Sequence, residues 1–274
     1  MEEAVAINPL GAALGAVVEG VDLARPLGAR LASALRAALW EWGVLFFPGQ
    51  SLEEAALEAF LAHFAPPAPE PFAYAASRDR PAAVTADMGP TRCATAVWHI
   101  DTTFVAAPPR YTALHAVEVP PFGGDTCFVS LTAAYDALST PLRRLAESLW
   151  ADHSAAATLD RLGLAPRQAP PRATHPLVRR HPETGRRALW FSEAGIVAFG
   201  ALSPLESEHL IGLLREHLKS PDLQVRWRWR AGDVALWDNA AVAHYAVPDY
   251  PGRRIIRRVV SAGEAPLSPA EGGS

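Results

Sequence analysis

The chain has 274 residues, of which 50% are apolar and 20% are charged, a composition typical of a folded globular protein. Its formal net charge of −4 argues against a nucleic acid as the partner, because proteins that bind duplexes carry a surplus of basic residues. The length suits one domain with a large core, and we expect a single domain over residues 1–274.

Apolar runs are short, and Gly43–Phe47 stops at Pro48-Gly49, far below the roughly 20 residues that span a bilayer. The acidic start Met1-Glu2-Glu3 lacks the basic residues of a secretory signal. The two cysteines, Cys93 and Cys127, can form at most one disulfide. We therefore expect reduced thiols, a cytoplasmic location and no membrane partner.

The first quarter of the chain predicts two helices around a buried strand. Ala29–Trp42 carries apolar residues at helical spacing, and Gly43–Phe47 after it is a buried strand. The second helix is predicted to start at Ser51, because Glu54 three residues later would complete a capping box.

Two more helical segments are predicted further along. Tyr135–Trp150 is helical in pattern, with a break or restart at Ser139-Thr140-Pro141. A last helix starts at Ser203, with Pro204 at its first position and Glu206 at its third, and ends before Ser220-Pro221.

The remaining segments are mostly predicted strands, short and rich in β-branched and aromatic residues. They are Tyr111–Val119, Thr126–Val129, Ala188–Phe191, Leu223–Trp229, Val234–Trp237 and Arg254–Ser261. Few helices around many strands favour a mainly β fold with flanking helices, a β-sandwich or jelly roll. The stretch Ser154–Arg172 is expected to be a surface excursion or a lid over one end of the barrel.

The strongest chemical signal is His99-Ile100-Asp101. In an extended segment residues i and i+2 point to the same face, so His99 and Asp101 can place an imidazole and a carboxylate on one metal ion. His244 offers a third ligand, and two histidines with one carboxylate form the facial triad of non-haem Fe(II) oxygenases. The alternative for the tripeptide alone is an ordinary strand with a hydrogen-bonded His–Asp pair.

Arginines alternate in the last predicted strand. Arg254 and Arg258 share one face, and Arg253 and Arg257 share the other. A buried arginine needs an anionic partner, and its planar fork matches a carboxylate such as that of 2-oxoglutarate. A solvated basic edge strand is the alternative, which suits Arg253 and Arg257 but explains two inward arginines poorly.

With these motifs in order, the chain resembles the taurine/2-oxoglutarate dioxygenase family over nearly its whole length. The motifs that carry the resemblance are Ile7–Gly11, Gly20–Leu23, Trp98–Phe104, Pro108-Pro109, Gly123–Thr126, Ala133–Ser139, Trp237–Asn239, His244–Ala246 and the arginine strand. The resemblance implies a double-stranded β-helix, a cupin-like jelly roll. It also implies Fe(II) ligation by His99, Asp101 and His244.

The same resemblance implies that Thr126 and Arg254 hold the distal carboxylate of 2-oxoglutarate and that Arg258 contacts an anionic group of the substrate. It implies a reaction in which 2-oxoglutarate and O₂ are consumed, succinate and CO₂ are released, and the substrate is hydroxylated. The carboxylate ligand Asp101 argues for hydroxylation, because related halogenases lack it.

The chain departs from the family at the substrate. Taurine-oxidising relatives carry a histidine and an aromatic residue after the second helix, where this chain has Glu70 and Tyr74, and an asparagine where it has Thr95. A carboxylate near a sulfonate would repel it, so taurine is not the expected substrate. We expect Arg258, Thr95, Glu70 and Tyr74 to contact a small organic anion: another sulfonate, a sulfate ester, an aryloxy acid or an amino acid. Glu70 is alternatively a solvated loop residue or a partner for a substrate amine.

Two other function classes stay open. A non-catalytic metal-binding sensor would use the same triad, but Thr126 and Arg254 argue against it. A nucleic-acid demethylase is suggested by the arginines of Arg226–Arg230, although one solvated strand face explains their alternation. No ligand role is assigned to the other histidines, of which His115 is a strand core residue and His153, His175 and His181 lie in loop-like stretches. Relatives suggest a homo-oligomer, a dimer or tetramer.

Overall fold

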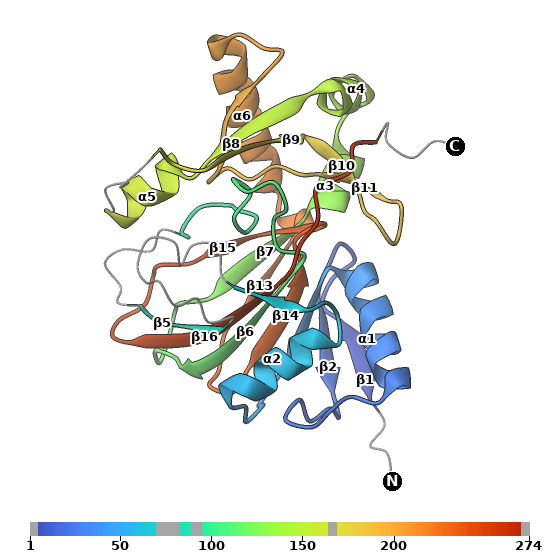
Figure 1. The fold of residues 1–274 in the computed structure, drawn as a ribbon, viewed down its shortest axis with the longest axis vertical. Helices are drawn as coiled ribbons and strands as arrows, with labels where there is room; N and C mark the ends of the chain where they lie inside the picture. Colours follow the sequence, from blue (N-terminus) through green and yellow to red (C-terminus); the bar gives the residue numbers. More distant parts are fainter. Residues whose placement is uncertain (1–4, 70–82, 89–94, 164–168, 270–274) are drawn as a thin grey trace.

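The computed structural model describes residues 5–69, 83–88, 95–163 and 169–269, and most of its elements are strands (Figure 1). The larger sheet has the order β1-β2-β3-β14-β6-β16-β4, with β5 paired to β16. These strands are β1 (Ala6–Pro9), β2 (Ala16–Glu19), β3 (Val44–Phe47), β4 (Pro67–Ala68), β5 (Ala83–Met88), β6 (Tyr111–Glu118), β14 (Val234–Asp238) and β16 (Arg254–Ser261).

A three-stranded sheet faces the larger one, in the order β13 (Gln224–Trp227), β7 (Thr126–Ser130) and β15 (Val242–Ala246). Phe128 of β7 packs edge-on against Phe46 of β3 and Trp237 of β14, with ring centroids 5.5 and 5.6 Å apart. All three side chains are fully buried, so the two sheets share one apolar core. The predicted jelly roll with flanking helices is confirmed.

Two helices cover the outer face of the larger sheet, α1 (Ala29–Trp42) and α2 (Glu54–Ala62) (Figure 1). The prediction for α1 is confirmed over its whole length. The predicted start of α2 at Ser51 is wrong, because the helix begins at Glu54 with Glu53 as its N-cap. Gln50 is bonded to the Gly232 carbonyl and to Val21 and Leu23, which holds the chain extended up to the helix.

A third layer lies above the two sheets in Figure 1 and is built on the three-stranded sheet β12-β8-β9. Its elements are α3 (Leu131–Ala137), α4 (Thr140–Ser148), β8 (Trp150–Ser154), α5 (Ala156–Leu162), β9 (Arg172–Pro176), β10 (Val178–Arg180), β11 (Arg187–Leu189), β12 (Ile196–Phe199), α6 (Pro204–Leu218) and a 3₁₀ turn at Pro221–Leu223. Trp190, Phe191 and Phe199 fill the apolar core between this layer and the β7–β15 sheet.

Side-chain hydrogen bonds cap the first turns of two helices in this layer, α3 and α6. The capping box of α6 is confirmed, since Glu206 accepts from the Ser203 amide at 2.8 Å while its own amide donates to the Ser203 hydroxyl at 3.3 Å. The predicted helix Tyr135–Trp150 is broken at Ser139 as expected, but it begins at Leu131 and ends at Ser148. The Ser130 hydroxyl caps the earlier start by accepting from the Ala133 amide.

The loop-like placement is wrong for two of the three histidines, since His153 lies in β8 and His175 lies in β9. His181 lies in the turn between β10 and β11, as predicted, and all three side chains are buried. The strands β8 and β9 form by pairing with each other, for example Ala151 opposite His175. Neither segment is rich in β-branched residues, so local composition does not predict them. The excursion at 154–172 likewise contains a short helix, α5, that its weak periodicity did not predict.

The strand β16 is not an edge strand, because it pairs with β6 on one side and with β4 and β5 on the other. Arg253 is exposed and pairs with Glu118, as a solvated position should. Arg257 is half-buried and donates to the Leu52 carbonyl at 2.6 Å, so a solvated edge is the wrong explanation for it. Among the described residues, no helix is both long and apolar enough to cross a membrane.

Candidate active site

Backbone pairing brings His99 and His244 together. Their amides and carbonyls exchange two hydrogen bonds, of 2.9 and 2.8 Å. This isolated antiparallel bridge places His99 beside β15, the strand that contains His244. Residues directly opposite in such a pair project to the same side, and the two imidazole centroids lie 4.0 Å apart. The pairing therefore places the two rings, which come from distant parts of the sequence, on one site.

Asp101 completes the cluster two residues after His99. Its Oδ1 atom lies 3.6 Å from Nε2 of His244, and one ligand atom from each of the three residues lies within 4.8 Å of the others. All three side chains are buried, with exposed fractions of 5 to 8%. The structure thus brings together the three residues that the sequence selects as metal ligands.

The protonation of the histidines suits a metal. Nδ1 of His99 lies 2.8 Å from the Val97 carbonyl oxygen, so it carries the proton and leaves the Nε2 lone pair free to bind. Burial lowers the pKa of His99 and holds the pKa of His244 well below its usual range. Both imidazoles are therefore neutral at neutral pH, which is the ligand form. Two neutral imidazoles and a carboxylate fit a divalent transition metal ion.

The two oxygens of Asp101 have different partners. Oδ2 accepts a hydrogen bond of 2.6 Å from the Thr112 hydroxyl, and Oδ1 lies 2.9 Å from the Arg258 guanidinium. Burial raises the pKa of Asp101, whereas His99 and the hydrogen bonds from Thr112 and Asn239 oppose that shift. Burial also lowers the pKa of Arg258 to about 10, so this arginine stays cationic at neutral pH.

The turn that precedes Thr126 packs against Arg254. Thr126 begins β7 and accepts a hydrogen bond of 2.9 Å from the indole of Trp229, and Arg254 is only 3% exposed. Gly124, two residues before Thr126, has a φ of +69°, and a Cβ there would lie 3.3 Å from Cδ of Arg254. The absence of a side chain at this glycine lets the turn lie directly on the arginine.

Of the other predicted substrate contacts, only Thr95 lies within the residues that the structure describes. Thr95 is half-buried, and its carbonyl accepts from the Ala246 amide at 3.0 Å, so it lies beside β15. Glu70 and Tyr74 lie outside the described residues, as does Cys93.

Sequence reasoning missed Thr112 and Arg161. Thr112 lies inside β6, and its hydrogen bond of 2.6 Å to Asp101 shows that it faces the site. Arg161 belongs to α5 in the predicted excursion and donates to the Ala194 carbonyl at 3.2 Å. Its charge contributes, after burial, to the low pKa of His99, so the excursion brings a cation close to the cluster.

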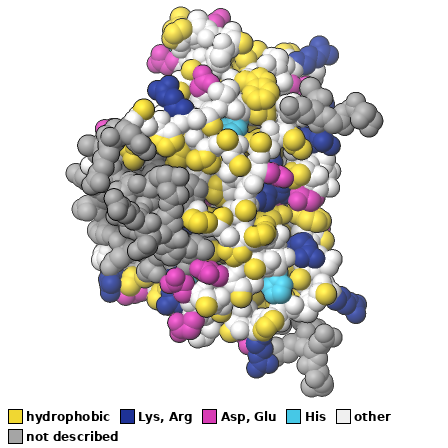
Figure 2. Space-filling model, in the orientation of Figure 1, with side chains coloured by type: hydrophobic (Ala, Val, Ile, Leu, Met, Phe, Trp, Pro, Cys, Tyr) yellow, Lys and Arg dark blue, Asp and Glu magenta, His cyan; other side chains and the backbone are white. Residues whose placement is uncertain are grey.

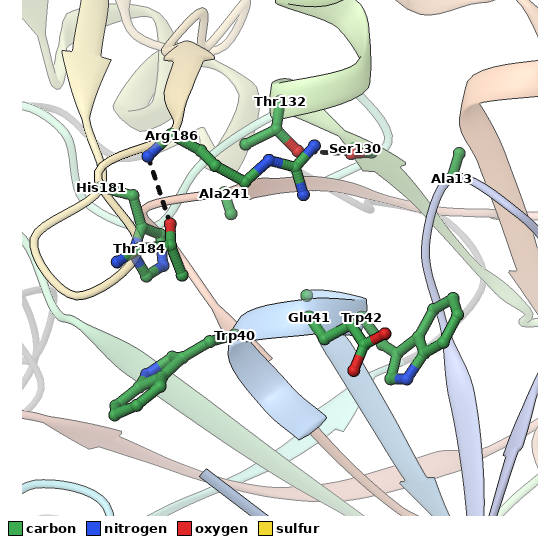
Figure 3. A pocket seen from close by; sticks show the side chains of 11 residues that line it. Ala13, Trp40, Glu41, Trp42, Ser130, Thr132, His181, Thr184, Arg186 and Ala241 are labelled. Atoms are coloured by element: carbon green, nitrogen blue, oxygen red, sulfur yellow. Dashed lines mark hydrogen bonds between the residues drawn. The ribbon is translucent and has the colours of Figure 1, made fainter. Parts of the chain in front are cut away.

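A small hollow lies elsewhere, where the end of α1, the start of α3 and the β10–β11 turn meet (Figure 3). Trp40 and Trp42 form one wall, and Arg186 extends across the other towards Thr132. None of the predicted site residues lines this hollow. It is therefore separate from the histidine–aspartate cluster.

Comparison with known proteins decides the family. The family model described as taurine catabolism dioxygenase TauD, TfdA family, matches residues 6–260. The chain belongs to the TauD/TfdA dioxygenase family. The match covers the elements that carry the cluster, from β1 to β16.

Relatives in the TauD/TfdA family match over nearly the full chain. The alpha-ketoglutarate-dependent sulfate ester dioxygenase of Pseudomonas putida is 37% identical, over 95% of this chain and 90% of its own. The alpha-ketoglutarate-dependent 2,4-dichlorophenoxyacetate dioxygenase of Cupriavidus pinatubonensis is 34% identical, over 95% and 99%. The crystal structure of a taurine dioxygenase from Burkholderia xenovorans has a TM-score of 0.84 and 36% identity, over 97% and 91%.

This TauD/TfdA protein is accordingly an oxidoreductase, a dioxygenase that uses Fe(II), O₂ and 2-oxoglutarate, which is also called alpha-ketoglutarate. The predicted family, enzyme class and cosubstrates are confirmed. The findings favour this activity over the alternative of a non-catalytic binding protein.

Proposed function

We propose that His99, Asp101 and His244 hold the Fe(II) ion of this dioxygenase. The observation that carries the proposal is the convergence of three buried ligand atoms within 4.8 Å, with both imidazoles held neutral. Bound there, Fe(II) would supply the activation of O₂ that couples oxidative decarboxylation of 2-oxoglutarate to hydroxylation of the substrate.

Thr126 and Arg254 are the proposed anchor for the distal carboxylate of 2-oxoglutarate. The buried Arg254, whose exposed fraction is 3%, favours a bidentate anionic partner. The hydroxyl of Thr126, two residues after the glycine that packs on this arginine, can donate one more hydrogen bond. The close packing of Gly124 on Arg254 keeps the arginine side chain in place before the cosubstrate arrives.

The proposed substrate is a small organic anion that Arg258 recognises, with Thr95, Glu70 and Tyr74 around it. Arg258 lies 2.9 Å from Asp101 with its side chain 22% exposed, so it combines closeness to the cluster with access from outside. The relatives act, by their names, on a sulfate ester, an aryloxyacetate and taurine. All three classes carry an anionic group, and a sulfate ester is the first class to test because of the 37% identity to the first of these relatives.

The reaction is tested by succinate release from protein loaded anaerobically with Fe(II) and then given 2-oxoglutarate and O₂. The panel contains sulfonates, sulfate esters, aryloxy acids and amino acids, each beside an uncharged analogue of similar size. We expect one anionic class to raise succinate release far above the substrate-free level and its uncharged analogue not to do so. His99→Ala should return release to the background, because a facial triad without one imidazole binds Fe(II) weakly.

His209→Ala is the matched control, since His209 is exposed on α6 and should leave release unchanged. Wild-type protein that binds neither Fe(II) nor 2-oxoglutarate would contradict the ligand assignment. Stimulation by uncharged analogues as strong as by anions would contradict the role of Arg258.

Surface charge does not favour the nucleic-acid alternative. On the described part of the face in Figure 2, basic and acidic side chains are interspersed. Arg226, one of the arginines that suggested a basic patch, pairs with Asp125 at 2.6 Å and with Asp249 at 3.3 Å. Its charge is therefore already compensated within the protein.

We also infer a homo-oligomer, a dimer or tetramer, and a cytoplasmic location. Large apolar side chains that remain exposed, among them Trp150 at 45% and Leu205 at 64%, support an association surface. Light scattering on the purified protein would give the number of subunits. One dioxygenase domain over residues 1–274 also remains a prediction.

A further inference from the structure

A chain of buried hydrogen bonds ends on the carboxylate of Asp101. The Thr112 hydroxyl lies 2.6 Å from Oδ2 of Asp101, and the Asn239 amide nitrogen lies 2.9 Å from the Thr112 oxygen. The indole nitrogen of Trp237 lies 3.1 Å from the Asn239 amide oxygen. The exposed fractions of Thr112, Trp237 and Asn239 are 0, 0 and 1%, so water does not compete for these bonds.

The direction of every bond in this chain is fixed by one group. An indole N–H can only donate, so the Asn239 oxygen must face Trp237 and its NH₂ group must face Thr112. The Thr112 oxygen then accepts from Asn239, and its own proton is left for Asp101. All three donors therefore point towards the carboxylate, which stabilises its anionic form.

Asn239 is itself held firmly. Its backbone amide donates to the Arg110 carbonyl at 2.9 Å, and its carbonyl accepts from the Trp190 indole at 2.9 Å. It lies in the turn between β14 and β15, two residues after the strand residue Trp237 that pairs with Thr112. Two sheet strands and a tethered turn thus hold the donor chain in place.

We propose that Thr112 and Asn239 are positioning residues that hold Oδ2 of Asp101, so that Oδ1, which faces His244 and also lies 2.9 Å from the Arg258 guanidinium, is the single oxygen that ligates the metal. Hydrogen bonding of the second oxygen favours a one-point carboxylate ligand and fixes the plane of the carboxyl group. The inference rests on the proposed role of Asp101 as a ligand of Fe(II).

The test compares Thr112→Val and Thr112→Ala, which lack the hydroxyl, with Thr112→Ser, which keeps it. Mn(II) binding to the full chain is measured by the electron paramagnetic resonance of the free ion, and the visible spectrum of the Co(II)-loaded protein reports ligand geometry. We expect Val and Ala to raise the Kd for Mn(II) roughly 10- to 100-fold and to change the Co(II) spectrum. Ser should stay within about threefold of wild type, because the donor is restored.

Thr132→Val is the matched control, since Thr132 is also buried and bonded, to Ser130 at 3.0 Å, but lies in the wall of the separate hollow. It should leave Mn(II) binding unchanged. Thermal unfolding of the metal-free variants shows whether each one folds. If folded Thr112→Val and Thr112→Ala proteins bind Mn(II) as tightly as wild type and give its Co(II) spectrum, the proposal is overturned.

Asp101→Ala separates this inference from the proposed function. If Asp101→Ala abolishes metal binding while Thr112→Val has no effect, only the positioning role fails. If Asp101→Ala binds Mn(II) as tightly as wild type, the assignment of Asp101 as a ligand fails, and the positioning role fails with it.

Discussion

At the residue scale, Trp229 sets the direction of the Thr126 hydroxyl. The indole nitrogen donates to the threonine oxygen at 2.9 Å, and an indole cannot accept in return. The threonine proton must therefore point elsewhere. If Thr126 binds the distal carboxylate of 2-oxoglutarate as proposed, Trp229 orients this donor before the cosubstrate binds.

Replacing Trp229 by Phe keeps an aromatic ring in the core and removes only the indole donor. We expect the Kd for 2-oxoglutarate to rise roughly 3- to 10-fold, which corresponds to the loss of about 1 kcal/mol from one oriented hydrogen bond. Isothermal titration of the metal-loaded protein with 2-oxoglutarate, under anaerobic conditions, measures this change.

A double-mutant cycle with Thr126→Val provides the control. In the Thr126→Val background the hydroxyl is gone, so Trp229→Phe should have little additional effect on the Kd. An equal effect in both backgrounds would show that Trp229 acts through packing and not through Thr126.

At the element scale, β8 and β9 hold the loop that follows Asp101. Nε2 of His175 in β9 lies 2.9 Å from the Thr103 carbonyl and 3.0 Å from the Val105 carbonyl, so it donates to the loop. His153 in β8 lies 2.9 Å from the Thr103 hydroxyl. The loop needs such support, because Thr102 has a φ of +45°, an unfavourable conformation for a β-branched residue.

His153 makes the stability of the apoprotein depend on pH. Burial, with a smaller contribution from His175, lowers the pKa of His153 to about 3, from an ordinary value of 6.5. In the unfolded chain His153 becomes protonated below about pH 6.5, whereas in the folded chain it becomes protonated only near pH 3. This group therefore removes stability as the pH falls through that window, by up to about 1.4 kcal/mol per pH unit.

Urea unfolding of metal-free protein at several pH values between 7.5 and 5 measures the effect. His153→Gln should lower stability at pH 7.5, because packing is lost, but its stability should fall less steeply towards pH 5 than that of wild type. The exposed His209→Gln variant should follow the wild-type slope. Parallel curves for wild type and His153→Gln would contradict the prediction.

At the scale of the whole molecule, one buried arginine joins distant segments. Arg110, directly before β6, lies 2.9 Å from Asp238 at the end of β14 and 2.5 Å from Glu183 in the β10–β11 turn. It also lies 3.0 Å from Glu264, after β16. Burial alone would raise the pKa of Asp238, but the Arg110 guanidinium and His181 hold it below its ordinary value.

Removing this arginine takes the cation from the fully buried carboxylate of Asp238. We expect Arg110→Met to lower the free energy of unfolding by about 3 to 5 kcal/mol, measured by urea denaturation. Arg25→Ala is the control, because Arg25 pairs with Asp22 at the surface with its side chain 83% exposed, and it should change stability by less than about 1 kcal/mol. Similar losses for the two variants would contradict the role of burial.

The sequence by itself determined those features that depend on the spacing of residues within one segment. A period of two places His99 with Asp101 and Arg254 with Arg258, and a period near 3.6 predicts Ala29–Trp42. The Ser203 capping box needs only neighbours within three residues. These predictions depend on dihedral preferences and side-chain direction within one segment, so no knowledge of other segments is required.

Tertiary structure decided everything that depends on pairing between distant segments. It placed His244 opposite His99, buried His153 and His175 in strands without a β-rich composition, and held Gln50 so that Ser51 does not cap α2. The hydrogen bond from Thr112 to Asp101 depends in the same way on the register of β6 against β14. Register and burial are set by long-range contacts and by competition for buried hydrogen bonds, which no local window of sequence contains.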